Sequence, residues 1–300
     1  MVTDDPHLAM DTGRKQRTIG RPAAVAGFGY WSGRDVRLEF RPAEVNTGIV
    51  FVRGDLPGCP AVPARVAYRV DAPRRTSLRS GTVAVEMVEH VLAALGGLGI
   101  DNCAVWLDQP EVPGLDGSAV PFVEALDAAG IVRQDAWQPR RLVERTVRVG
   151  SQDQWIEVCP PDASVPVFRY ELDYGSAGPI GRQVFEIALT PDSFRRELAP
   201  CRTFLLKAEA QWLHAQGIGR RTTARDLLVF DEGGPIDNHE RFPDECARHK
   251  LLDLVGDLAL AGCDLVGRFS AYRSGHHHNA ELVRALVPDA DAGGARRRCA

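Results

Sequence analysis

The segment FPDECARHKLLDLVGDLALAGC, residues 242–263, has the features of one long helix. Asp244 is a favourable N-cap, and apolar residues fill most of the body that follows. Through this body run His249, Asp253 and Asp257, each four residues after the last, so they lie along one edge of the helix. Ionisable groups in an apolar helix are costly unless they are paired or bind a metal. The segment therefore predicts a functional site on this helix.

The composition is that of an ordinary globular protein, with 44% hydrophobic and 25% charged residues. A net charge of -4, with both signs mixed along the chain, argues against nucleic-acid binding, which needs a basic face. No apolar run is long enough to span a bilayer, and the polar first residues do not resemble a secretory signal. We expect a cytoplasmic protein without stable membrane insertion. The seven cysteines contain no CxxC pair, so we expect no disulfide framework.

The expected strands and helices form two blocks separated by a proline-marked segment. We predict a disordered leader at 1–15, domain I at 16–134, a linker at 135–141, domain II at 142–287 and a disordered tail at 288–300. Each block contains several expected strands and about two helices, one of them expected over residues 82–98. The predicted class is α+β, with two domains of related architecture.

Two further groups of ionisable residues lie outside the first helix. Glu89 and His90 fall within the apolar stretch VAVEMVEHVLAALGG, and the run GHHH at 275–278 directly follows a predicted strand. Loops after strands are common places for catalytic groups. Taken alone, Glu89 could instead belong to a solvated helix edge, and the histidine run could be an exposed loop.

Together these groups predict a catalytic metal site. His249 and Asp253, at positions i and i+4, can bind one metal from the same side, and His90 could supply a third ligand from the other domain. Three nitrogen or oxygen ligands with one open position are typical of catalytic zinc. Glu89 would then lie beside the attacking water as a general base.

Three more residues could assist this chemistry. His276 could act as a general acid or stabilise an oxyanion, and Lys250 would add a positive charge beside the site. Asp257 could orient that imidazole or a ligand. Alternatively, Asp257 could form a buried salt bridge with Arg248 or Arg268.

Five stretches of the sequence are similar to those of a known enzyme family. They are VEHVLAALGGLGIDN (88–102), PEVPGLDGSAVPF (110–122), CRTF (201–204), RFPDECARHKLLDLVGDLALAG (241–262) and AYRSGH (271–276). Over about residues 16–287 the chain resembles the zinc-dependent UDP-3-O-acyl-N-acetylglucosamine deacetylases, amidohydrolases of the committed step of lipid A biosynthesis. The resemblance implies two domains, each a β-α-α-β sandwich, with the active site at their interface. It also implies a UDP-sugar substrate with an acyl chain, and we expect a monomer.

The resemblance implies roles for individual residues. The zinc ligands are His90, His249 and Asp253. The catalytic residues are Glu89 as general base, His276 as the second imidazole, Asp257 behind it, and Thr203 and Lys250 beside the metal. The substrate-binding residues are Phe204 near the sugar and acyl groups, with Glu209 and Arg273 near the nucleotide. Sites of histidine and carboxylate ligands also accept Fe²⁺, which is the alternative metal.

The chain departs from the family pattern at three places. Tyr30 and Trp31 stand where the family usually has Leu-His, which implies altered packing or substrate contact at the mouth of the site. Glu86 adds a negative charge about one helical turn before Glu89. The third departure is the loop 217–226, which in the family helps to line an acyl tunnel.

This loop carries Arg220, Arg221 and Arg225, and a guanidinium is unsuited to lining a hydrocarbon passage. We expect these arginines at the surface; if they point inward, they could bind phosphate. They motivate one alternative, a zinc deacetylase paralogue that acts on a less lipidic N-acetyl amino sugar. Another alternative is a non-catalytic paralogue that binds sugar nucleotides.

Overall fold

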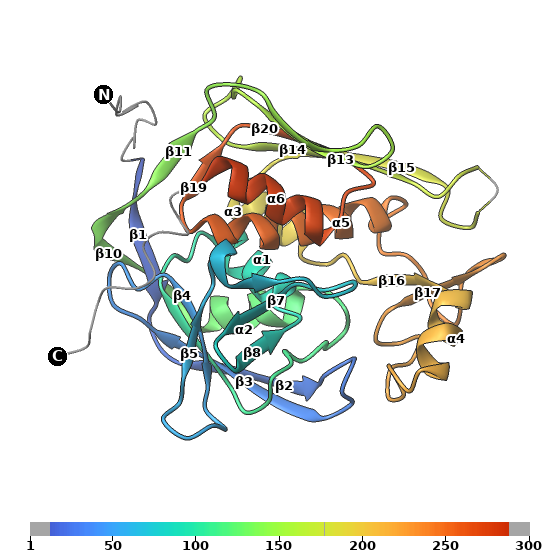
Figure 1. The fold of residues 1–300 in the computed structure, drawn as a ribbon, viewed down its shortest axis with the longest axis horizontal. Coiled ribbons are helices and arrows are strands. Elements are labelled where there is room, and N and C mark those ends of the chain that lie inside the picture. Colours follow the sequence, from blue (N-terminus) through green and yellow to red (C-terminus); the bar gives the residue numbers. More distant parts are fainter. Residues whose placement is uncertain (1–12, 177, 288–300) are drawn as a thin grey trace.

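The computed structural model describes residues 13–176 and 178–287. Figure 1 shows its main body as stacked layers, with a sheet above, a sheet below and helices between them. This arrangement confirms the α+β class expected from the sequence. None of the helices in the described part of the chain combines the length and the apolar composition needed to cross a membrane.

The lower sheet comes from the N-terminal half and has the strand order β2-β3-β9-β4-β5. Its strands are β2 (Ala23–Phe28), β3 (Asp35–Pro42), β4 (Ile49–Arg53), β5 (Ala61–Pro63) and β9 (Cys103–Leu107). Neighbouring strands are antiparallel except β4 and β9, which are parallel. In β3, the buried residues Val36, Leu38 and Phe40 alternate with less buried ones, so one face of the sheet supplies the core.

The upper sheet comes from the C-terminal half and has the strand order β12-β13-β20-β14-β15. Its strands are β12 (Val147–Gly150), β13 (Trp155–Cys159), β14 (Val167–Asp173), β15 (Arg182–Ala188) and β20 (Arg268–Tyr272). The one parallel pair is β14 with β20. Both sheets therefore place their strands in the chain order first, second, fifth, third, fourth, and the two halves share one sheet topology.

Four helices fill the space between the sheets (Figure 1). They are α1 (Glu89–Leu98), α2 (Val120–Ala129), α5 (Glu245–Leu258) and α6 (His276–Leu286). Helix α5 packs against β14 and β15, α6 against β12 and β13, and α2 against β2, while α1 packs on α5 across the middle. Each half thus supplies one sheet and one helix layer, and the β-α-α-β order belongs to the whole chain. This corrects the expectation of such a sandwich in each domain, because the helices of one half cover those of the other.

The helix expected over residues 82–98 begins later than predicted. Val83–Glu86 forms strand β8, which pairs with β7 (Ser77–Ser80), and β7 pairs in turn with β6 (Arg69–Val70). Met87 follows with φ of 60°, a left-handed conformation that a continuous helix does not allow. Helix α1 starts two residues further on. Glu89 and His90 are therefore its first two residues, at the end that points toward the site.

The leader was predicted to reach residue 15, but strand β1 (Arg14–Ile19) already includes Arg14 and Lys15. Strand β1 pairs with β10 (Ile131–Gln138), and Arg14 contacts two carboxylates, Asp101 at 2.7 Å and Asp264 at 2.8 Å. These contacts hold the start of β1 against both halves of the chain. The rest of the predicted leader and the predicted tail, residues 1–12 and 288–300, lie outside the described residues.

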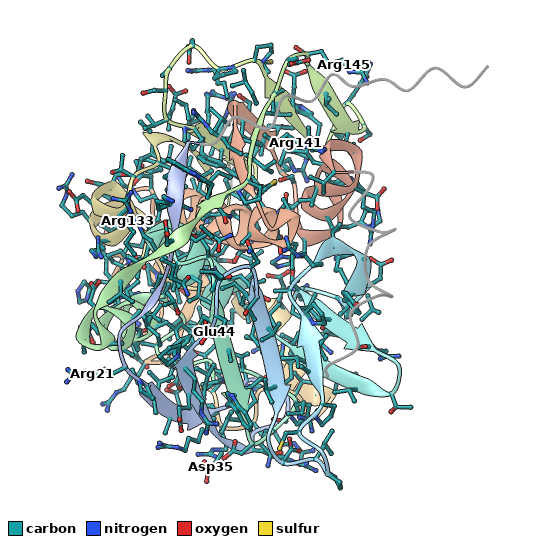
Figure 2. All side chains as sticks on the ribbon, turned by 90° about the vertical axis from the view of Figure 1, so that its left-hand side faces the viewer. Arg21, Asp35, Glu44, Arg133, Arg141 and Arg145 are labelled. Atoms are coloured by element: carbon teal, nitrogen blue, oxygen red, sulfur yellow. The ribbon has the colours of Figure 1, made fainter. Side chains whose placement is uncertain are left out.

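The predicted linker, residues 135–141, is also part of strands rather than a loop. Strand β10 continues to Gln138, and β11 (Arg140–Leu142) pairs in parallel with β19 (Asp264–Val266) of the C-terminal half. Figure 2 shows this segment from the side, rising from Arg133 at about mid-height of the molecule to Arg141 and Arg145 in the upper part. Strand pairing at both ends holds the connection between the halves in place.

A smaller unit projects beside the main body, at the right of Figure 1. It contains β16 (Phe204–Leu206), α4 (Lys207–Ala215), β17 (Leu228–Asp231) and β18 (Gly234–Pro235). Four short helical segments complete the described elements: η1 (Val66–Tyr68), α3 (Pro191–Ser193), η2 (Phe194–Leu198) and η3 (Ala259–Ala261). The projecting unit forms one wall of the cavity described next.

Candidate metal centre and active site

Three buried residues from two helices meet where α1 crosses α5. His90 comes from the start of α1, and His249 and Asp253 come from α5. The Nε2 atom of each imidazole lies 3.5 Å from Oδ1 of Asp253, and one potential ligand atom from each residue lies within 4.8 Å of the others. The structure thus brings together the three residues that the sequence singled out as metal ligands.

The protonation states of His249 and Asp253 suit metal binding. His249 Nδ1 lies 3.1 Å from the carbonyl oxygen of Cys201, and because a carbonyl only accepts, Nδ1 carries the hydrogen and Nε2 keeps its lone pair. Burial lowers the pKa of His249 to about 3, so its imidazole is neutral. Burial opposes ionisation of Asp253, but the nearby Lys250 ammonium group holds its pKa well below the usual range. Neutral imidazole and ionised carboxylate are the forms that bind a divalent metal.

Lys250 is tied to the same carboxylate. Its Nζ atom donates to Oδ2 of Asp253 at 2.7 Å, while Oδ1 faces the two imidazoles. Burial would lower the pKa of Lys250, but the negative charge of Asp253 raises it above its ordinary value. Lys250 is therefore a fixed positive charge at the edge of the site.

Glu89 is the first residue of α1 and is only 3% exposed, so it is not part of a solvated helix edge. One of its carboxylate oxygens, Oε2, accepts a hydrogen bond of 2.9 Å from the backbone N–H of Thr76. Burial raises the pKa of Glu89 above its ordinary value. A carboxylate with a raised pKa next to His90 is well suited to accept a proton.

His276 is the first residue of α6, and its Nδ1 lies 2.8 Å from Oδ2 of Asp257. Burial would lower the pKa of this imidazole, but the Asp257 carboxylate raises it to about 9. The imidazole is therefore protonated at neutral pH. Within the run GHHH, the His276 side chain is 11% exposed and that of His277 is 61% exposed, so the residues of the run differ in environment.

Asp257 accepts hydrogen bonds from three side chains, namely those of His276, Asn279 and Thr76. The alternative of a buried salt bridge with Arg248 or Arg268 is wrong. Arg248 pairs with Asp244 and Glu197, and Arg268 pairs with Asp162 and Glu186. Asp257 lies behind His276, as the resemblance implied.

The three candidate metal ligands, Glu89 and His276 border a cavity of about 990 Å³. Ten of the eleven residues singled out from the sequence line it, and Asp257, behind His276, is the exception. Thr203 Oγ1 donates to the carbonyl of Gly117 at 3.2 Å. The ring of Phe204 lies 6.1 Å from that of His249, which places an apolar surface beside the metal centre.

Glu209 and Arg273 lie at the rim of the cavity. Oε2 of Glu209 accepts the backbone N–H of Leu206 and so caps α4, and Oε1 pairs with Arg74 of the N-terminal half at 2.9 Å. Arg273 is exposed and has φ of 51°. The pair of Glu209 and Arg74 joins the projecting unit to the other half across the rim.

Arg75 connects two of the departures from the family pattern. Its guanidinium lies 4.1 Å from the ring centroid of Trp31, and its Nε donates to Glu86 at 3.0 Å. Tyr30 is buried and donates its hydroxyl hydrogen to the carbonyl of Asp226 at 2.5 Å. The charge of Glu86 is thus neutralised locally, and the aromatic pair is part of the packing at the mouth of the cavity.

The three loop arginines, Arg220, Arg221 and Arg225, are exposed and are not among the described residues that line the cavity. Arg221 reaches the N-terminal half, where it donates to the carbonyl of Gly33 at 2.8 Å and to Asp35 at 2.7 Å. This agrees with the expectation that the arginines lie at the surface. The cavity wall formed by this loop is built from its other residues.

Sequence reasoning missed two residues that contact Asp257. Thr76 is one of several polar residues around the start of a short strand, and Asn279 directly follows the histidine run. Neither takes part in a spacing pattern or belongs to a run of ionisable groups. Only the folded chain shows that both approach Asp257.

Comparison with known proteins adds an independent observation. Residues 16–288 match the family model described as LpxC, UDP-3-O-acyl N-acetylglycosamine deacetylase. Proteins named UDP-3-O-acyl-N-acetylglucosamine deacetylase from Brucella ovis, Brucella abortus and Brucella melitensis are each 39% identical to the chain over 280 residues. Each alignment covers 92% of this chain and 96% of the relative.

Proposed function

The chain belongs to the UDP-3-O-acyl N-acetylglycosamine deacetylase family, and on this premise we propose the following reaction for it. The protein hydrolyses the N-acetyl group of UDP-3-O-acyl-N-acetylglucosamine to acetate and a free amine, the committed step of lipid A biosynthesis. The observation that carries the proposal is the convergence of His90, His249 and Asp253 with Glu89 and His276 at one cavity.

The donor set fits a divalent metal. Two imidazoles and one carboxylate, all buried, match the ligands of catalytic zinc, and Lys250 balances the second carboxylate oxygen of Asp253. We propose Zn²⁺ held by His90, His249 and Asp253, with Fe²⁺ as the alternative. When bound, such an ion supplies a Lewis acid that polarises the amide carbonyl and acidifies water.

Glu89 acts as the general base in this proposal. Its buried carboxylate, with a raised pKa, removes a proton from the attacking water. The water oxygen then bonds to the amide carbon, and the negative charge moves to the carbonyl oxygen. Lys250 and Thr203 border the cavity beside the metal ligands, where the Lys250 cation stabilises this charge and the Thr203 hydroxyl does so when it turns its hydrogen from the Gly117 carbonyl to the substrate.

His276 acts as the general acid. Its Nδ1 is held by Asp257, so Nε2 is the nitrogen that reaches the substrate. The protonated imidazole donates its Nε2 proton to the leaving nitrogen as the C–N bond breaks, which yields acetate and the amine. Its raised pKa keeps this proton available at neutral pH.

For the substrate, we propose that Phe204 contacts the sugar and acyl groups, and that Glu209 and Arg273 contact the nucleotide at the rim. The chain then comprises two domains, one per sheet, with the site between them and the connection near residues 135–141. We further propose that the protein is monomeric and acts in the cytoplasm, where UDP-sugars are used.

The exposed positions of Arg220, Arg221 and Arg225 favour the acylated substrate over a less lipidic amino sugar, because no guanidinium of this loop lies along the cavity. The test compares kcat/KM of the zinc-loaded enzyme for UDP-3-O-acyl-N-acetylglucosamine and for UDP-N-acetylglucosamine. We expect a strong preference for the acylated compound. Equal values for both would reject this substrate and support the alternative deacetylase.

A further inference from the structure

Thr76 lies between the proposed general base and the proposed general acid, and it contacts both. We propose that Thr76 is a positioning residue for the deacetylation, in which its backbone fixes Glu89 and its hydroxyl fixes the pair of Asp257 and His276. The inference rests on the proposed function and adds to it a residue that does not itself touch the substrate. Thr76 is fully buried, at the point where the chain enters β7.

The backbone of Thr76 is bound to the start of α1 at two points. Its N–H donates to Oε2 of Glu89 at 2.9 Å, and its carbonyl accepts the N–H of Val88 at 3.2 Å. The first contact commits one oxygen of the Glu89 carboxylate and fixes the direction of the other, Oε1. We assign to Oε1 the proton taken from the attacking water.

The hydroxyl of Thr76 is bound to the C-terminal half. Oγ1 lies 2.5 Å from Oδ1 of Asp257, and since a carboxylate only accepts, the hydroxyl donates this hydrogen bond. The lone pairs of Oγ1 then face Nδ1 of His276 at 3.2 Å, while Nδ1 donates to the other carboxylate oxygen at 2.8 Å. The Nδ1–H group is held between two acceptors, which leaves Nε2 as the proton donor to substrate.

These contacts cross the interface between the two halves. Glu89 and Thr76 belong to the N-terminal half, and Asp257 and His276 belong to the C-terminal half. Catalysis requires a base and an acid to hold their relative positions within a few tenths of an ångström. Thr76 contacts both, so a single residue connects the proposed base to the proposed acid.

The first test compares Thr76→Val, which removes the hydroxyl at nearly constant volume, with Thr76→Ser, which keeps it. If a lost hydrogen bond to a charged group costs its full energy in the transition state, the rate falls by about 10- to 100-fold. We expect T76V to lower kcat by this factor with KM within about two-fold and metal content unchanged, and T76S to restore most of kcat. If T76V keeps full kcat, or if T76S is as impaired as T76V, the proposal is overturned.

The neighbouring residue provides a matched control. Ser77 is buried as the first residue of β7, directly after Thr76, and its hydroxyl has no hydrogen-bond partner among the described residues. Ser77→Ala therefore removes a buried hydroxyl without removing a contact to the site, and we expect kcat to stay within about two-fold of wild type. A loss as large as that of T76V would show that any change in this strand impairs the enzyme, and it would overturn the specific role of Thr76.

A second measurement does not depend on activity. In ¹⁵N NMR spectra of metal-free protein, we expect a resolved Nδ1–H signal from His276 in wild type and T76S, and a broadened or shifted signal in T76V. Thr76→Ala gives the same comparison if T76V does not fold. Identical spectra in all variants would overturn the proposal. If wild type shows no deacetylase activity, the proposed function fails, while the spectra still decide the role of Thr76 in holding His276.

Discussion

Gly256 of α5 and Glu89 of α1 touch through their backbones. A methyl group placed on Gly256 would lie 2.1 Å from the carbonyl oxygen of Glu89 and 3.1 Å from the backbone nitrogen of Ala93. The absence of a side chain lets the two helices cross closely enough for His90 to reach the ligands of α5. This glycine is needed for the space that its hydrogen leaves, since its φ is not in the left-handed region.

Gly256→Ala is accordingly expected to destabilise the protein and separate the metal ligands. Backbone atoms cannot rotate away as a side chain can, so the free energy of unfolding should fall by about 1–3 kcal/mol or more. Urea denaturation with a metal-binding titration would measure both effects. The control is Gly233→Ala, where the nearest atom is Oδ1 of Asp231 at 3.5 Å, and where we expect a change within about 0.5 kcal/mol. Equal stability of G256A and wild type would contradict the packing argument.

Removal of a proposed ligand should reduce metal content together with activity. His249→Ala leaves two of the three donors, so we expect a much lower occupancy after dialysis, measured by elemental analysis. Asp253→Ala should have an additional effect on stability, because it also leaves the half-buried Lys250 side chain without its 2.7 Å partner. Full occupancy in either variant would reject the proposed donor set.

Glu89→Gln tests the role of Glu89 as a general base independently of metal binding. The amide oxygen of glutamine can still accept the N–H of Thr76, so the start of α1 should keep its conformation. We expect kcat to fall by about 10²- to 10⁴-fold with metal content unchanged, as for loss of a general base. Steady-state rates on metal-quantified samples would test this. A variant with near wild-type kcat would assign the base to another group.

The stability of the metal-free protein should depend on the protonation of His276. Burial would lower the pKa of His276, but the Asp257 carboxylate raises it from 6.5 to about 9 in the folded state. A raised folded-state pKa means that the stabilising contribution is complete below about pH 6.5 and is lost as the pH rises toward 9. Urea denaturation of wild type and His276→Gln from about pH 6 to about pH 9.5 should show a stability difference that shrinks across this window. A difference that grows with pH would contradict the ion pair.

Substitution of the loop arginines should not alter the use of an acyl chain. Arg220 and Arg225 are exposed outside the cavity lining, so the double change to alanine should leave kcat/KM for the acylated substrate within about two-fold. Arg221→Ala should cost at most about 1 kcal/mol, because its pair with Asp35 is exposed. A large rise in KM for the double variant would indicate that these arginines contact substrate.

Several parts of the fold could be predicted from local patterns. The four-residue spacing of His249, Asp253 and Asp257 identified both the helix and its polar edge, because helix geometry alone places such residues on one side. The start of α1 was misplaced, because the left-handed φ of Met87 has no signal in its residue type. The strands of the segment around Gln138 could not be predicted, because their partners lie far away in the sequence.

The sequence by itself determined the chemistry available: two imidazoles and a carboxylate at ligand spacing, a neighbouring acid and a further histidine. Helical periodicity and the preferences of metals for donor atoms are local properties, so they can be read without coordinates. The tertiary structure alone decided which groups act on one another. Helices α1 and α5 cross at Gly256, and Thr76 contacts both Glu89 and Asp257. These contacts join residues separated by up to 181 positions in the sequence. Such contacts depend on the packing of whole layers, which no local pattern specifies.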